Sequence, residues 1–136
     1  MPPNRRIAPL EEPAGFVRAD GYGLYQPAPR HVHVGELIEL SYAATRYARE
    51  QNISRQVLDL RRLTGFGIPS MSDRFEFSQR LAGASQAMVK VVVVCPVEVI
   101  DKRGFGISVA RHRGLTAERF ASEQYALAWL LDHNTG

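Results

Sequence analysis

Hydroxyl groups and an arginine follow a glycine break in the segment VLDLRRLTGFGIPSMSDRFEF, residues 57–77. Ser70 and Ser72 stand where a helix is expected to begin, and a serine there accepts a hydrogen bond from an otherwise unpaired backbone amide. Asp73 follows Ser70 by three residues and completes a variant of the capping box. The alternative is a regulated phosphosite, because a phosphate at a helix start meets the positive end of the dipole and can pair with Arg74.

The arginines form a second group, at the ends of two predicted strand segments. If those strands are parallel, Arg61, Arg62 and Arg103 converge at one edge of the sheet, where guanidinium groups favour an anion. The alternative is a solvated rim in which these arginines pair with neighbouring carboxylates, namely Asp59, Glu98 and Asp101.

Aromatic side chains gather around the same two loops. They are Phe66, Phe75, Phe77 and Phe105. They either line a pocket or partner surface, or they pack within the core and its loops. The motif Gly-Phe-Gly occurs at 65–67 and 104–106, but two glycines around one aromatic residue do not make a phosphate-binding loop.

Residue types that serve metal binding or covalent catalysis form no recognisable constellation. His31 and His33 would share a face of an extended stretch, but no third ligand has suitable spacing, and His33 is equally placed to start a helix. Cys95 lies between four valines and Pro96, so we expect a small apolar residue that ends a buried strand. No pair of carboxylates shows the separation needed for acid/base hydrolysis. We therefore predict no catalytic residue, no cofactor and no metal.

The composition is typical of one globular domain. The 136 residues are 45% hydrophobic and 23% charged, and a net charge of +3 arises from arginines interspersed with acidic residues. Because nucleic-acid binders gather their basic residues on one face, we expect no nucleic-acid partner. A single cysteine, no apolar run of membrane-spanning length and no apolar signal core predict a cytoplasmic protein without a membrane span.

Hydrophobic periodicity and turn residues predict the elements that position these side chains. A flexible or loosely docked, proline-rich tail is expected at 1–14, before a single domain at 15–136. The expected elements are a hairpin at 15–26 with a type I′ turn at Asp20-Gly21, helices at 33–52, about 71–84, within 102–114 and at 122–133, and strands within 55–63, 88–96 and 115–120. The helix at 33–52 carries an apolar stripe of Leu37, Leu40, Ala44 and Tyr47.

The uninterrupted β-branched run at 91–94 indicates a strand buried on both faces, which is typical of a central parallel strand. Strands alternate with helices along the chain. This alternation predicts an α/β domain with a four- to five-stranded, mostly parallel mixed sheet and about four helices.

The order of five segments resembles the SpoIIAA-like, STAS-type family over roughly residues 34–132, and more narrowly an uncharacterised bacterial branch of it. The segments read DLRRLTGF, PSMSDRFEFSQ, VKVVVVCP, GFGISVARHRGL and FASEQYALAWLL. The resemblance implies the same α/β fold, in a group that includes anti-sigma-factor antagonists and has lipid-binding CRAL-TRIO relatives. In the antagonists a serine is phosphorylated in an Asp-Ser-Ser-Gly type turn; here GIPSMSD holds Ser70 and Ser72 but lacks that order.

We therefore expect a non-enzymatic binding or regulatory module that acts through a protein partner or as a homodimer. The expected surface combines the 64–74 loop, the helix after it and the 102–113 segment. Its candidate residues are Arg61, Phe66, Ser70, Ser72, Arg74, Arg103 and Phe105. The alternative function is a carrier of a small apolar, lipid-like ligand, and an anion is a further possible ligand.

Overall fold

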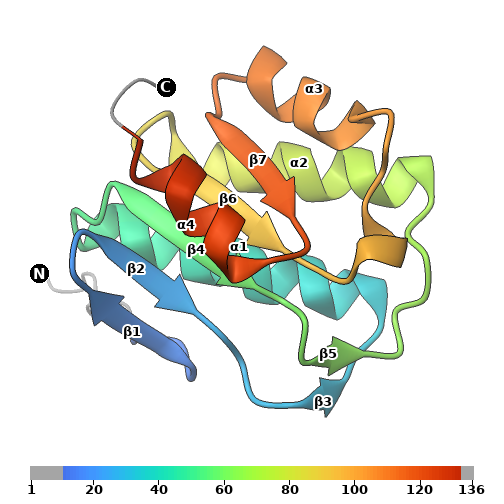
Figure 1. The fold of residues 1–136 in the computed structure, drawn as a ribbon, viewed down its shortest axis with the longest axis horizontal. Coiled ribbons are helices and arrows are strands. Elements are labelled where there is room, and N and C mark those ends of the chain that lie inside the picture. Colours follow the sequence, from blue (N-terminus) through green and yellow to red (C-terminus); the bar gives the residue numbers. More distant parts are fainter. Residues whose placement is uncertain (1–10, 133–136) are drawn as a thin grey trace, which may run out of the picture.

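The computed structural model describes residues 11–132, in which helices pack against both faces of one sheet (Figure 1). The elements in chain order are β1 (Phe16–Ala19), β2 (Tyr22–Tyr25), β3 (Arg30–His31), α1 (Val34–Glu50), β4 (Arg55–Asp59), β5 (Leu63–Thr64), α2 (Met71–Ser85), β6 (Lys90–Val94), the 3-10 helix η2 (Val97–Val99), α3 (Phe105–His112), β7 (Ala117–Phe120) and α4 (Glu123–Leu130). Residues 1–10 of the expected tail lie outside the described part of the chain.

The main sheet has five strands in the order β1-β2-β4-β6-β7. β1 runs antiparallel to β2, and the other neighbouring strands are parallel. The predicted class, an α/β domain with a mostly parallel mixed sheet, is confirmed. A feature not expected from the sequence is a separate two-stranded parallel pair, in which β3 lies beside β5.

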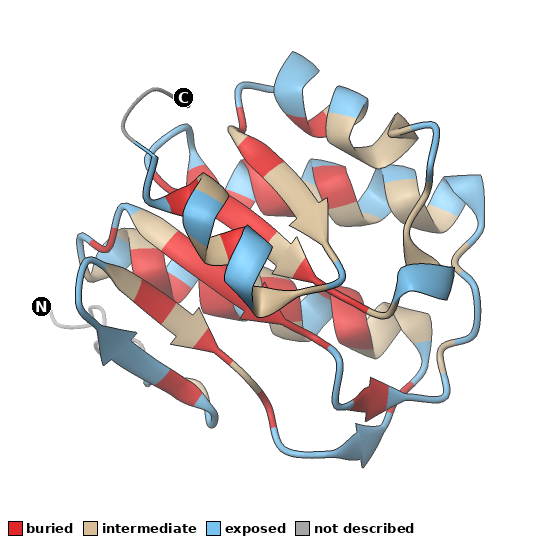
Figure 2. Cartoon of the chain, viewed as in Figure 1, coloured by how far each residue is buried: buried red, intermediate tan, exposed pale blue. Residues whose placement is uncertain are grey.

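β4 and β6 are neighbours in the middle of this sheet and run in the same direction. Val57 pairs with Val92, and Asp59 pairs with Val94. Both strands are buried along most of their length, as the red bands across the centre of Figure 2 show. The valine run therefore forms the central parallel strand that its composition predicts.

The helices divide unequally between the two faces of the sheet. Side chains of α1, α2 and α3 share one core cluster with alternate strand residues such as Leu58 and Val91. α4 lies on the opposite face (Figure 1), where its Ala126 and Leu130 pack against Val57, Val92 and Val94. From β2 to β7 the strand order advances in one direction, so crossovers of the same hand place α1, α2 and α3 on one face.

The helix starts follow the sequence signals. His33 is the N-cap of α1, and its Nδ1 accepts a hydrogen bond from the Glu36 amide, so it begins a helix. Ser70, not Ser72, is the N-cap of α2: its Oγ accepts from the Asp73 amide, and the Asp73 carboxylate accepts from the Ser70 amide. Ser122 is the N-cap of α4, but its side chain makes no capping hydrogen bond.

The hairpin connection differs from the type I′ turn expected from the sequence. A type I′ turn needs positive φ at both central residues. Gly21 has a φ of +87°, whereas the non-glycine residues with positive φ in residues 11–132 are Asn52, Gln86 and Ala87. Asp20 is not among them, so the type I′ prediction is wrong. Asp20 and Gly21 still join β1 to β2, because one left-handed glycine at the second turn position also reverses a chain.

Candidate functional site

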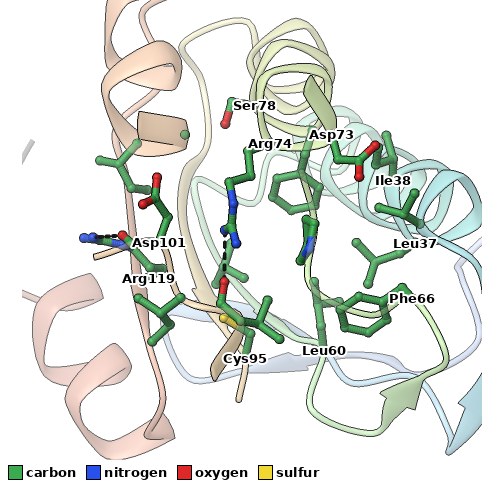
Figure 3. A pocket seen from close by; sticks show the side chains of 18 of the residues that line it. Leu37, Ile38, Leu60, Phe66, Asp73, Arg74, Ser78, Cys95, Asp101 and Arg119 are labelled. Atoms are coloured by element: carbon green, nitrogen blue, oxygen red, sulfur yellow. Dashed lines mark hydrogen bonds between the residues drawn. The ribbon is translucent and has the colours of Figure 1, made fainter. Parts of the chain in front are cut away.

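A cavity of about 120 Å³ opens at the carboxyl ends of β4 and β6, between the sheet and the helices α1, α2 and α3 (Figure 3). Its lining combines the strand ends, the loop before α2, the first turns of α2 and the segment from η2 into α3. The lining residues used below are Leu60, Phe66, Arg74, Cys95, Val99 and Ile107. We refer to this cavity as the apolar pocket.

The walls of the apolar pocket are hydrophobic for reasons that the fold makes clear. Leu60 and Val93 stand at the ends of the parallel strands, on the face that α1, α2 and α3 cover. Phe66 closes one side from the loop after β5, and Ile107 closes the other from α3; both pack against the main core while remaining partly exposed. A concave apolar site with few polar groups is the usual form of a binding pocket.

Arg74 brings a positive charge into this apolar setting. It lies in the second turn of α2, and its Nη1 donates a 2.9 Å hydrogen bond to the carbonyl oxygen of Val99 (Figure 3). That bond ties α2 to the segment after β6. The ion pairs found among residues 11–132 do not include Arg74.

The two carboxylates of the pocket accept hydrogen bonds from backbone amides. Asp73 belongs to the capping box of α2. Asp101 accepts hydrogen bonds of 2.8 Å from the Phe105 amide and 3.0 Å from the Arg103 amide. The bond from Phe105, together with that from Arg103 and the nearby charges of Arg74 and Arg119, holds the pKa of Asp101 below its ordinary value. Asp101 thus shapes the loop that leads into α3.

Cys95 contributes a protonated thiol to the pocket wall. Its side chain is buried, and this burial raises its pKa to about 11, although the charges of Arg74 and Arg119 act in the opposite direction. Because the thiolate is the nucleophilic form, a thiol with this pKa is a poor nucleophile at neutral pH. Its small apolar character fits the prediction of a residue that ends a buried strand.

The structure brings only some of the predicted site residues together. Phe66 and Arg74 line the pocket. Ser70 caps α2, and Ser72 is exposed in the first turn of that helix. Phe105 begins α3, where its amide is bound by Asp101.

Arg61 and Arg103 are not part of the lining of the apolar pocket. Arg61 forms a two-point ion pair with Asp59 and lies 3.5 Å from a carboxylate oxygen of Glu123, the first residue of α4. Arg103 lines a shallow groove between α3 and β7 with Arg111 and other polar residues. The structure therefore gives Arg61 the carboxylate pairing that was the alternative to a shared anion site.

Several lining residues carry no motif and were missed by the sequence reasoning. Val99 ends η2 and Ile100 follows it, Ile107 lies on α3, and Ser78 faces the pocket from α2. The signal available was weak: the apolar residues in VEVI, directly after Pro96, form no repeating pattern that predicts which side they occupy.

No group of three or more histidine, cysteine, aspartate or glutamate side chains in residues 11–132 is arranged to hold a metal ion. Within the same residues, no helix has the length and apolar character needed to cross a membrane.

Comparisons of this chain with protein families, with curated proteins and with solved structures found no match.

Proposed function

We propose that this protein is a non-enzymatic binding module that acts through contact with a protein partner at the mouth of the apolar pocket. The observation that carries the proposal is the presence of exposed hydrophobic side chains on segments that also line the pocket. Ile68 in the loop before α2 is 64% exposed, Met71 at the start of α2 is 58% exposed, and Val97 in η2 is 63% exposed. These three residues, which we call the docking face, belong to the two segments that supply much of the pocket lining.

A partner suited to this surface inserts one apolar side chain into the pocket and covers the docking face with its neighbouring residues. Binding energy at interfaces concentrates in a few anchors that fill pockets, and the surrounding contacts mainly exclude water. The cavity matches one anchor in size, since a cavity of about 150 Å³ lined by aliphatic and aromatic side chains accepts a benzene ring. The STAS-like order of segments supports the same proposal, as the group includes proteins that act by binding other proteins.

The test places a photo-crosslinking amino acid at position 71 in cells of the source organism. A matched control places it at Tyr125, which is 67% exposed on α4, on the opposite face of the sheet. The proposal expects a crosslinked protein at position 71 that is absent at position 125. The purified partner should then bind the unaltered chain and bind Ile68→Ser and Met71→Ser at least tenfold more weakly, but bind Tyr125→Ser normally.

Two outcomes contradict the proposal. One is an equal crosslinking pattern at positions 71 and 125, and the other is a partner whose affinity is unchanged by both docking-face substitutions. A second copy of this chain found as the crosslinked partner supports the proposal, provided that Ile68→Ser also abolishes the dimer in light scattering.

A second candidate function is the transport or sensing of a small apolar ligand, and the apolar pocket itself favours it. The cavity of about 120 Å³ is smaller than the roughly 300–1,000 Å³ of sites for drug-sized ligands, so a long-chain lipid does not fit inside without rearrangement. Native mass spectrometry of the freshly purified chain tests this candidate. A co-purifying mass of ring-compound size supports it, and a bare chain at every protein concentration counts against it.

A further inference from the structure

We propose that the apolar pocket binds a small apolar carboxylic acid, with the hydrocarbon part against the phenylalanine and aliphatic walls and the carboxylate on Arg74. This inference concerns the interior of the pocket. It goes beyond the proposed protein contact and does not require a protein partner, and a free acid in the pocket would compete with the partner's side chain for the same space.

The charge argument begins with the partners that Arg74 has and lacks. One hydrogen bond, to the carbonyl of Val99, uses a single N–H of a guanidinium group that has five. The carboxylate of Asp73 is held by the Ser70 amide, and that of Asp101 is held by two loop amides. Neither carboxylate forms an ion pair with Arg74.

The other arginine of the pocket is already satisfied. Arg119 donates from Nη1 to the Glu118 carboxylate at 2.8 Å and from Nη2 to the carbonyl of Asp101 at 2.7 Å. Arg74 is thus the pocket arginine, among the described residues, that forms no ion pair, although its charge acts on the nearby carboxylate of Asp101. A planar guanidinium fork matches the two oxygens of a carboxylate, and such charge-assisted bonds are about twice as strong as neutral ones.

The apolar residues of the lining determine the hydrocarbon part of the proposed ligand. Phe66, Phe77, Leu60 and Ile107 present hydrocarbon surface. The volume of about 120 Å³ accommodates one ring or one branched chain, by comparison with the benzene-binding cavity of about 150 Å³. The ligand class is therefore a short acid such as an arylacetic or branched aliphatic acid.

An apolar group joined to a carboxylate occurs both in a free acid and at the carboxyl terminus of a peptide that ends in an apolar residue. Phenylacetate represents the free acid, and N-acetylleucine represents the chain end. Phenylacetamide has the shape of phenylacetate without its charge. Titration of the unaltered full chain with each compound, followed by calorimetry, compares the three directly.

We expect phenylacetate to bind about tenfold more tightly than phenylacetamide, because a charged hydrogen-bonded pair replaces a neutral one. If N-acetylleucine binds as tightly as phenylacetate, the natural ligand is the carboxyl terminus of a peptide. If N-acetylleucine binds more weakly than phenylacetate, the natural ligand is a free acid. In Arg74→Gln the preference for the acid should disappear. It should persist in Arg80→Gln, which changes an arginine of the same helix that pairs with Glu39 on the surface.

The comparison of phenylacetate with phenylacetamide needs no variant, so it decides the matter even if Arg74→Gln does not fold. Equal affinity for the two compounds overturns the proposal, as does a lack of binding at millimolar phenylacetate. Arg74→Lys, which keeps the charge but loses the fork, should retain part of the preference.

Discussion

Arg61 holds the buried carboxylate of Asp59 by two parallel hydrogen bonds, 2.9 Å from Nε to Oδ1 and 2.7 Å from Nη2 to Oδ2. The side chain of Asp59 is fully buried at the end of β4, while that of Arg61 is 38% exposed. Gln26 donates a further bond of 2.8 Å to Oδ2 and so connects this pair to the segment after β2. Arg61 also lies 3.5 Å from a carboxylate oxygen of Glu123, so the pair joins three parts of the chain at the carboxyl edge of the sheet.

This pair makes the stability of the protein sensitive to acid. Burial alone raises the pKa of Asp59, but the hydrogen bonds from Arg61 and Gln26 outweigh it and hold the pKa below the ordinary value of 3.8. A group with a lowered folded-state pKa stabilises the protein fully above its unfolded-state pKa, and this stabilisation is lost as the pH falls through the folded-state value. We expect the free energy of unfolding, measured with urea, to fall as the pH decreases below about 4.

Asp59→Asn tests the source of that dependence. Breaking a fully buried ion pair costs about 3–5 kcal/mol. Because Arg61 reaches solvent, we expect Asp59→Asn to lower the free energy of unfolding by about 2 kcal/mol at pH 7. The free energy of unfolding of this variant should also decline less steeply as the pH falls. Part of the decline should remain, since Glu39 and Asp101 also have lowered pKa values. Asp20→Asn, in the exposed hairpin, is the control. An Asp59→Asn variant with the acid profile of the unaltered chain would contradict this account.

The two serines at the start of α2 should differ in their effect on stability. Ser70→Ala removes a side chain that caps the helix and should lower the free energy of unfolding by about 1 kcal/mol. Ser72→Ala changes an exposed residue inside the helix and should shift it by less than about 0.5 kcal/mol. Thermal unfolding of the two variants, side by side, measures the difference. Equal losses, or a larger loss for Ser72→Ala, would contradict the assignment of the cap.

The thiol of Cys95 should react slowly while the protein is folded. With a pKa of about 11, only about one thiol in ten thousand is ionised at pH 7, and the side chain is also buried. We expect a disulfide-exchange reagent to modify the native chain slowly, and faster as the pH rises. The urea-unfolded chain should react at the rate of a simple peptide thiol. Rapid and complete modification of the folded chain at pH 7 would disagree with this prediction.

Gln56 offers a test of the packing between α1 and β4. Its Oε1 accepts a 2.9 Å hydrogen bond from Thr45, but its Nε2 is buried and finds no partner among the described residues. Because an unsatisfied buried donor costs about 1–3 kcal/mol, Gln56→Met should change the free energy of unfolding by less than about 1 kcal/mol. Gln56→Glu buries a carboxylate in the same shape and should lower it by several kcal/mol. A loss above about 2 kcal/mol for Gln56→Met would show that Nε2 has a bound partner such as water.

The centre of the fold follows directly from the sequence. An uninterrupted run such as Val91–Val94 has no polar face to turn toward water, so it must lie inside a sheet covered on both sides. The apolar stripe of α1 is equally informative: Leu37, Ala44 and Tyr47 are buried, and Leu40 packs against the same core. Both are local patterns whose period matches the element that they form.

The pocket was predicted less completely, because its residues come together only through tertiary packing. Phe66 and Arg74 were expected at a binding surface and lie in its lining. Val99 and Ile107 reach it through the turn after β6 and the orientation of α3, neither of which has a repeating sequence signal. Arg61 pairs with Asp59 and Glu123, because α4 covers the opposite face and brings Glu123 close to it.

The most direct test of the central claim is a methyl NMR titration of the full chain with phenylacetate. The account predicts that methyl signals of Leu60, Val93 and Ile107, which line the pocket, shift together with one saturation curve. Signals of Leu130, on the opposite face of the sheet, should stay in place. Shifts centred on α4, or no saturable change in the pocket signals, would contradict the account.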